Sequence, residues 1–190
     1  MMLRFTIWAE PQPKGSTQSR GFILKDKATG RARYDRHGNP VIITSTRSAN
    51  PNLKGWEQLV AETANRALGA LPEAERGVLQ NGVFVTAAFY LPRPQRFLIE
   101  KWARPGAPVP PHETRPDLDK LARGVLDALS GVVWSNDAQV ARLTAMKSYV
   151  LIRGRQPDPP HADLWIQPAP QPVATLEELL RDQPLFAEIG

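Results

Sequence analysis

The residues best suited to chemistry are aspartates in the second half of the chain. Between residues 116 and 155 every acidic residue is an aspartate, namely Asp117, Asp119, Asp127 and Asp137. Mg²⁺ prefers hard oxygen ligands and is often bound by one or two carboxylates together with water and substrate phosphate. Such an ion activates water and neutralises charge on a phosphate during cleavage. We therefore expect Asp117, Asp119 and Asp137 to gather around Mg²⁺ for phosphodiester hydrolysis.

The position of Pro116 indicates how the first two aspartates are presented. Proline disfavours helix at the preceding residue and suits the first turn of a helix. Apolar residues then recur with helical period, which predicts a helix over 118–129. Carboxylates at i and i+2 diverge on a helix, but they can converge where an extended chain enters one. Asp117 and Asp119 are thus expected at a strand-to-helix junction.

A purely structural explanation of these aspartates stays open. Aspartate is a common residue at a helix start, where it caps backbone amides. Asp127 lies four residues after Arg123, which is the spacing of a surface ion pair on a helix. Asp137 could cap its own turn.

The remaining pattern predicts an α+β fold, a mixed sheet with two main helices packed on it. Strands are expected over 3–8, 83–91, 140–152 and 162–166, and the other main helix over 56–68. A hairpin is expected over 30–44 with its turn at 36–39. Residues 92–116 read as a long proline-rich loop, and 175–181 as a short helix. The expected division is a domain over 1–166 and a Pro-rich acidic tail over 167–190.

The charge is distributed unevenly. Residues 1–155 hold 23 Lys and Arg against 13 acids, whereas residues 156–190 hold one Arg against six acids. A basic body favours a polyanionic partner such as DNA, although a charge of this size also suits an ordinary solvated surface. The candidate DNA contacts are Lys14, Arg20, Lys25, Arg31, Arg33, Arg93, Arg96, Lys101 and Arg115.

The composition excludes several classes of site. The chain has no cysteine, which rules out a disulfide framework, a thiolate metal site and a cysteine nucleophile. No stretch approaches the roughly 20 apolar residues of a membrane span, and the first residues lack the apolar run of a secretory signal. A cytoplasmic protein with no membrane partner is expected.

One gapless block resembles a known family. Residues 115–119 (RPDLD), 125–129 (VLDAL) and 131–140 (GVVWSNDAQV) are similar to the RusA family of Holliday junction resolvases, common in bacteria and their phages. A weaker similarity covers Pro11 to Ser16. The resemblance implies a small α+β homodimer that makes paired nicks in branched DNA, the Holliday junction, with Mg²⁺ as cofactor. It maps the family's metal-binding and catalytic aspartates onto Asp117, Asp119 and Asp137.

Two positions depart from the family pattern. The family usually has a catalytic lysine where this chain has Arg123, and asparagine where it has Lys120. Arginine holds a phosphate but does not exchange a proton near neutral pH. Arg123 therefore serves if the family lysine supplies charge alone; otherwise Lys120 or water must carry the proton. A DNA-binding protein without catalysis, a nuclease for other DNA structures and an interaction module remain the alternatives.

Overall fold

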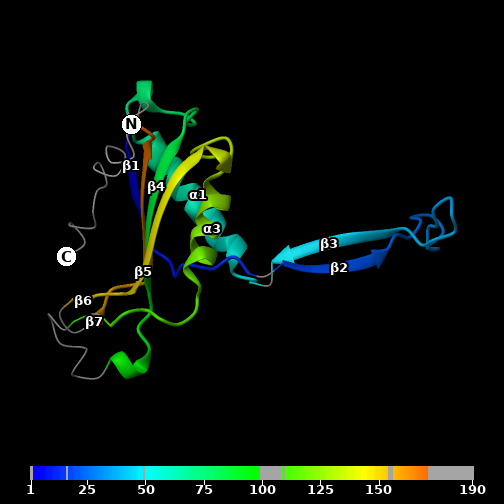
Figure 1. Cartoon of the computed structure of the whole chain (residues 1–190), viewed down its shortest axis with the longest axis horizontal. Helices are drawn as coiled ribbons and strands as arrows, with labels where there is room; N and C mark the ends of the chain where they lie inside the picture. Colours follow the sequence, from blue (N-terminus) through cyan, green and yellow to red (C-terminus); the bar gives the residue numbers. More distant parts are fainter. Residues whose placement is uncertain are drawn as a thin grey trace.

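The computed structural model describes residues 2–15, 17–48, 50–98, 108, 110–153 and 156–170, without the side chains of 17–20, 45–48 and 153. A four-stranded sheet forms the centre of the body (Figure 1). Its strand order is β1 (Leu3–Ile7), β8 (His161–Pro168), β4 (Val83–Leu91) and β5 (Val140–Tyr149). β8 pairs antiparallel with both β1 and β4, whereas β4 and β5 are parallel. The sheet is therefore mixed.

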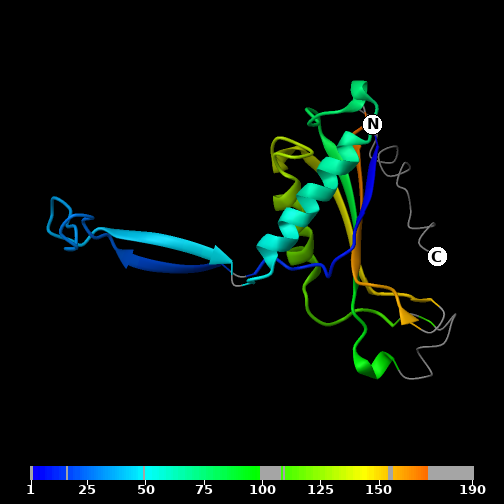
Figure 2. The same ribbon diagram turned by 180° about the vertical axis from the view of Figure 1, so that it is seen from behind.

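Two helices lie on one face of this sheet (Figures 1 and 2). They are α1 (Leu53–Gly69) and α3 (Leu118–Leu129), and the bounds of α3 are those expected from the apolar period. Both bury an apolar stripe against the sheet, where Val60 of α1 and Leu121 of α3 are fully buried. The predicted α+β architecture, with two main helices on a mixed sheet, is confirmed.

The remaining elements are short. In the described part of the chain, three 3₁₀ turns span Glu73–Glu75 (η1), Gln95–Phe97 (η2) and Asp137–Gln139 (η3), and the short strands β6 (Ile152–Arg153) and β7 (Gln156–Pro157) pair with each other. η2 lies inside the segment expected to be an irregular loop. β8 runs two residues past the expected domain boundary at 166. The predicted helix over 175–181 lies outside the described residues.

The N-terminal hairpin is longer than its prediction. β2 (Thr17–Ile23) pairs antiparallel with β3 (Ile42–Ser48), so the ladder extends upstream of residue 30. The local turn is present, because Gly38 donates its amide to the Asp35 carbonyl at 3.1 Å and adopts a positive φ of 81°. Tyr34 and Pro40 form an antiparallel bridge across this turn, and Val41 donates its amide to the Arg33 carbonyl at 2.8 Å, so the short hairpin predicted within 30–44 is present. The prediction missed the longer β2–β3 ladder, because a local turn pattern does not reveal which distant segment continues the pairing.

The order of elements around α3 decides where its ends lie. α3 is the crossover between the parallel strands β4 and β5, so it runs back along the sheet. Its first residue lies at the carboxyl ends of these strands, and its last residue precedes the amino end of β5. Among the described residues, no helix is long and apolar enough to cross a membrane.

Candidate active site

The first turn of α3 presents Asp117 and Asp119 at the carboxyl ends of β4 and β5. In open sheets with parallel strands, ligands bind at this edge. Asp117 is the N-cap residue with an extended backbone (φ −70°, ψ 138°), and its side chain makes no capping hydrogen bond. Asp119 lies in the first helical turn, and both residues are exposed. The strand-to-helix junction predicted for the pair is therefore present, and the Asp117 carboxylate is free of a cap.

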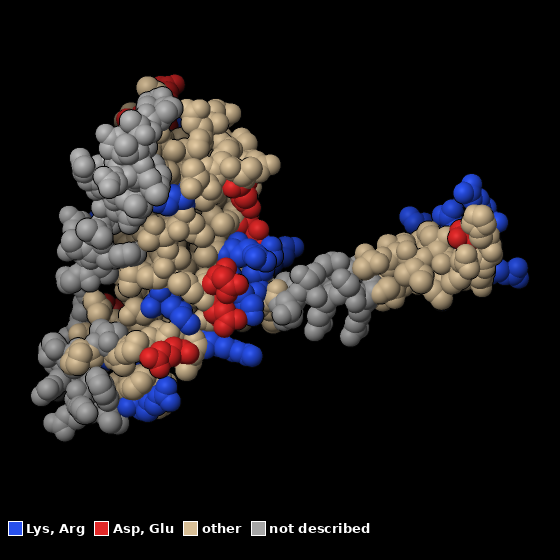
Figure 3. All heavy atoms as spheres, viewed as in Figure 1, with Lys and Arg blue, Asp and Glu red and all other residues tan. Residues whose placement is uncertain are grey.

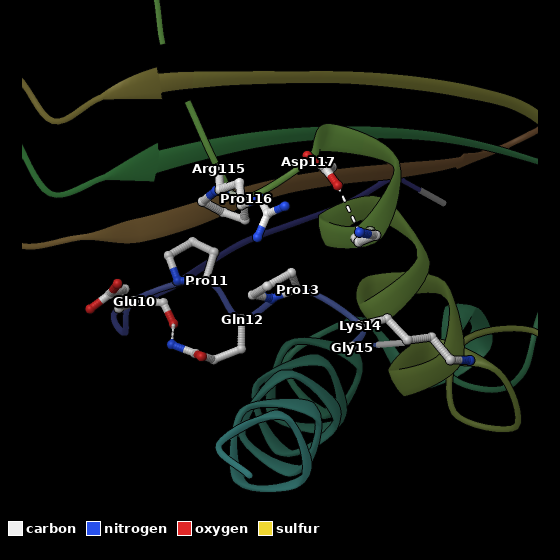
Figure 4. Close-up of a pocket in the computed structure, with 10 residues that line it drawn as sticks. Glu10, Pro11, Gln12, Pro13, Lys14, Gly15, Arg115, Pro116 and Asp117 are labelled. Carbon is white, nitrogen blue, oxygen red and sulfur yellow. Dashed lines mark hydrogen bonds and ion pairs between the residues drawn. The ribbon is translucent and has the colours of Figure 1, made fainter. Parts of the chain in front are cut away.

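Lys120 is the direct partner of Asp117. Its Nζ lies 2.7 Å from Oδ2 of Asp117, one helical turn further on (Figure 4). This hydrogen bond, and then the positive charge of Lys120, hold the pKa of the Asp117 carboxyl below its usual value. Asp117 is therefore an anion across the neutral range, and a cation already lies beside it.

Lys147 of β5 fixes the chain that leads into the helix. Its Nζ donates to the carbonyl oxygens of Thr114 at 2.8 Å and Pro116 at 2.9 Å. The two bonds join the strand to the residues immediately before Asp117. Sequence reasoning missed this residue. A lysine inside the apolar period of 140–152 was the available signal.

An open hollow borders this end of α3 (Figure 4). Its volume is about 430 Å³, and its walls come from residues 10–15, which follow β1, and from the start of α3. Arg115, Pro116, Asp117 and Lys120 line it. A neighbouring hollow of about 470 Å³ shares Glu10, Arg115 and Pro116 and adds Arg93, Arg96 and His112. The carboxylate therefore lies in a recess whose other charged residues are mostly cationic.

Asp137 lies at the opposite end of α3. It begins η3, just before β5, and its Oδ1 accepts a hydrogen bond from the buried indole Nε1 of Trp134 at 3.1 Å. A helix of 12 residues is about 18 Å long, which is the order of the separation from Asp117. Among the described residues, no group of three or more acidic or histidine side chains is close enough to hold a metal ion.

The expected gathering of three carboxylates is thus not observed within one chain. The structure brings Asp117 and Asp119 to one end of α3 and leaves Asp137 at the other. The physical reason is the crossover: a helix between two parallel strands separates the residues that precede it from those that follow it. The three aspartates belong to one gapless block of sequence, but they are not close together in the structure.

Asp127 has a different partner from the one its spacing suggested. It forms an ion pair with Lys14, from the segment that follows β1, rather than with Arg123. Glu57 of α1 is close by, and burial, followed by the charge of Asp127, raises the pKa of its carboxyl. The Lys14 ammonium thus pairs with Asp127, and its positive charge acts against the raised pKa of the Glu57 carboxyl.

Arg123 lies on the exposed face of α3. The buried residues of the helix include Leu121, Ala122 and Val125, so residues 119 and 123, one turn apart, share the outward face. Asp119 and Arg123 are therefore presented together to whatever binds that face.

The candidate DNA contacts lie in different parts of the structure, and Lys14 pairs with Asp127. Lys25, Arg31 and Arg33 are exposed at the far end of the β2–β3 hairpin, where Lys and Arg gather in Figure 3. Arg96 and Arg115 are exposed beside the hollows. Arg93 is only 8% exposed, and its Nε donates to the Val150 carbonyl at 2.7 Å, so it supports the fold rather than a phosphate contact. Lys101 and the side chain of Arg20 lie outside the described residues.

The chain matches a known protein family. The family model for endodeoxyribonuclease RusA matches residues 25–154, more than half of the chain. The matched range contains Asp117, Asp119 and Asp137, as well as α1, β4 and β5. No curated protein matches the chain. The chain belongs to the RusA family of endodeoxyribonucleases, which resolve Holliday junctions.

Proposed function

We propose that this protein is a Mg²⁺-dependent endonuclease that acts as a homodimer and resolves four-way DNA junctions by paired nicks during recombination and repair. The observation that carries the proposal is the presentation of Asp117 and Asp119 at the carboxyl ends of two parallel strands, beside a recess that Asp117 lines together with Arg115 and Lys120. The family match supplies the class of substrate.

The donor set fits magnesium. Asp117 and Asp119 offer exposed carboxylate oxygens, and one or two carboxylates with water and substrate phosphate form a usual Mg²⁺ shell. Lys120 already holds an ammonium against Asp117, which indicates that this carboxylate accepts a cation. When bound, the ion would activate a water and neutralise charge on the scissile phosphate.

The surrounding side chains have separate roles in this proposal. Arg115 and Lys120 attract and orient the phosphate at the mouth of the hollow. Arg123, on the outward face beside Asp119, stabilises negative charge that develops on the phosphate. Lys147 is a positioning residue, because it fixes the carbonyls of Thr114 and Pro116 and thereby the backbone that carries Asp117. Lys120 or water carries the proton that arginine does not exchange.

In this proposal a second copy of the chain supplies Asp137, which lies too far from Asp117 and Asp119 within one copy. A twofold axis near the middle of α3 would set two helices antiparallel, because isologous contacts repeat the same patch on both subunits. Each first turn would then face the end of the partner's helix, which is the end that carries Asp137. Asp137 would complete the site of the other copy, and two such sites would make the paired nicks.

Selectivity for a junction follows from shape in this proposal. Cations bind phosphates without reading sequence, so they position the duplex arms. The exposed cations at the hairpin end, including Lys25 and Arg33, lie far from the recess (Figure 3) and would reach flanking duplex.

The decisive experiment is cleavage of a synthetic four-way junction with and without Mg²⁺. Asp119→Asn and Asp137→Asn are each expected to abolish nicking while leaving junction binding intact. When the two variants are mixed under conditions of subunit exchange, one mixed dimer carries one intact composite site. About one quarter of wild-type nicking should return, because half of the dimers are mixed and each has one of two sites.

The other outcomes are equally informative. Binding with no Mg²⁺-dependent nicking by the wild-type chain would identify a DNA-binding protein without catalysis. Equal cutting of plain duplex and junction would assign another nuclease specificity. If mixing restores nothing, the composite site is wrong, and if Asp119→Asn cuts normally, the catalytic assignment is wrong.

A further inference from the structure

A second hollow lies beside the recess that Asp117 lines. Its volume is about 470 Å³, and it shares Glu10, Arg115 and Pro116 with that recess (Figure 4). Pro116 directly precedes Asp117 in the chain. A DNA strand with a phosphate at Asp117 therefore runs past this second hollow, to which the proposed function gives no role.

Much of the wall of the second hollow is apolar. Leu91 and Pro92, at the end of β4, line it together with Pro94. These side chains offer no hydrogen bond, so they suit the flat face of an apolar or aromatic ring. Two exposed cations, Arg96 and Arg115, also line the hollow and favour a phosphate backbone close to it.

Three aromatic side chains form a row at this hollow. Tyr149, the last residue of β5, is 2% exposed. The centroid of its ring lies 4.4 Å from that of the His112 imidazole and 5.4 Å from that of Phe97. His112 is only partly buried, and it lines the hollow together with Tyr149. Tyr149 thus supports the imidazole from one side, and the imidazole borders the hollow.

His112 contributes a ring rather than a charge. Burial, followed by the positive charge of Lys147, holds the pKa of the imidazole below its usual value, so the ring is mainly neutral near pH 7. Its Nδ1 is buried and makes no hydrogen bond to any part of the chain that the structure describes. Buried polar atoms of a structural side chain normally have a partner. The contact of its ring is therefore what His112 provides.

We propose that the second hollow holds one unstacked base of the DNA strand, next to the phosphate that is cut, and that this base stacks on His112. Aromatic side chains beside a cationic path bind single-stranded nucleic acid in this way, because every base has a π face. Arg96 and Arg115 hold the backbone of the same nucleotide. The inference rests on the proposed function, because that function places the scissile phosphate at Asp117.

A base suits the second hollow better than a further phosphate does. Arg93, the buried cation of the wall, donates its Nε to the Val150 carbonyl at 2.7 Å, so it is committed to the fold. The neutral imidazole of His112 adds no charge for a phosphate. Bases at the crossing point of a four-way junction have fewer stacked neighbours than bases within a duplex arm. One of them therefore leaves the stack at a lower cost.

The test combines variants of His112 with junctions that lack one base. Binding is measured in EDTA, with an abasic site placed in turn at each nucleotide around the crossing point. His112→Ala should bind the intact junction about 10-fold more weakly than the wild type. His112→Phe keeps a ring and should bind as the wild type does. On the junction that lacks the stacked base, His112→Ala and the wild type should bind equally.

His161→Ala is the matched control. His161 also packs its ring on a tyrosine, with 4.4 Å between the centroids of its imidazole and Tyr90, but it is not among the residues that line either hollow. Its removal should lower the melting temperature as His112→Ala does and leave the binding of every junction unchanged. If both variants weaken binding alike, His112 acts through the fold alone and the proposal is wrong.

A photochemical measurement uses the wild-type chain and so does not depend on the folding of a variant. 5-Iodouracil, placed in turn at the same nucleotides, cross-links on irradiation to a side chain in direct contact with it. Mass spectrometry of the cross-linked peptide should identify His112 or Tyr149 at one position. Cross-links that never involve either residue would overturn the base site.

The failure of this inference is distinct from the failure of the nuclease assignment. A wild-type chain that cuts junctions, with the same loss of binding by His112→Ala on intact and abasic junctions, would overturn the base site and keep the nuclease. Base-dependent binding through His112 by a chain that never cuts would do the reverse.

Discussion

Lys14 and Asp127 form an ion pair between residues 113 positions apart, which joins the segment after β1 to the last turn of α3. Glu57 lies near the same carboxylate, and Lys14 offsets the resulting repulsion. Lys14→Met should therefore lower the free energy of unfolding by about 1 kcal/mol, as for an ion pair that is partly exposed to solvent. Denaturant titration measures the loss, and adding Glu57→Gln should recover part of it. A purely additive double variant would show that the three groups are not coupled.

Glu57 also gives a pH dependence. Its pKa in the folded protein is raised above the ordinary 4.5, first by burial and then by Asp127. A carboxyl whose pKa is higher in the folded than in the unfolded protein stabilises the folded state at pH values below its unfolded pKa. This stabilisation is lost as the pH rises through the folded pKa. Stability of the wild type relative to Glu57→Gln should thus fall on going from acid to neutral pH. A difference in melting temperature between the two proteins that stays constant across this pH range would contradict the raised pKa of Glu57.

Lys120 controls the ionisation of Asp117. Its hydrogen bond and charge lower the pKa of that carboxyl, so Lys120→Met should raise the pKa towards the ordinary value. The contribution of Asp117 to stability is present above its unfolded pKa and lost as pH falls through the folded one. Titration of the carboxyl ¹³C resonance in metal-free protein measures the change. Lys27→Met, in the exposed segment between β2 and β3, is the control, and an unchanged Asp117 pKa in Lys120→Met would refute the pairing.

Lys147 positions the start of α3 without lining the hollow. Lys147→Met removes two hydrogen bonds to the carbonyls of Thr114 and Pro116 and should cost roughly 1 to 2 kcal/mol of stability. If it acts through Asp117, kcat for junction cleavage should fall about 10-fold with little change in KM, because the reacting geometry loosens. Lys147→Arg should recover part of the loss. Reduced stability with unchanged kcat would make Lys147 structural alone.

Variants of Arg123 distinguish two roles for the lysine that the family usually has at this position, namely positive charge and proton transfer. Arg123→Ala should reduce nicking about 100-fold if the guanidinium stabilises charge on the phosphate. Arg123→Lys should retain activity under the same hypothesis. A large gain for Arg123→Lys, with a new basic limb in the pH profile, would instead show that proton transfer limits the natural chain.

The sequence determined the secondary structure around the site because its signals there are local. The apolar period of α3 and the proline before it define the helix, and the β-branched and aromatic run of β4 defines that strand, each with the bounds observed. The aspartate block likewise indicated the family that the later match confirmed. Composition alone excluded cysteine chemistry.

Only the tertiary structure decided which of these residues meet. Crossover of α3 between parallel strands placed Asp117 and Asp137 at opposite ends of one helix, although 20 residues of near-continuous motif join them. The same packing paired Asp127 with Lys14 and buried Arg93. It also placed the Lys147 ammonium within hydrogen-bond distance of two carbonyls in the loop before the helix. These contacts join residues far apart in the chain, and their energies depend on strand order and burial. The periodicity of apolar residues along a sequence contains no information about strand order or about which polar residues become buried.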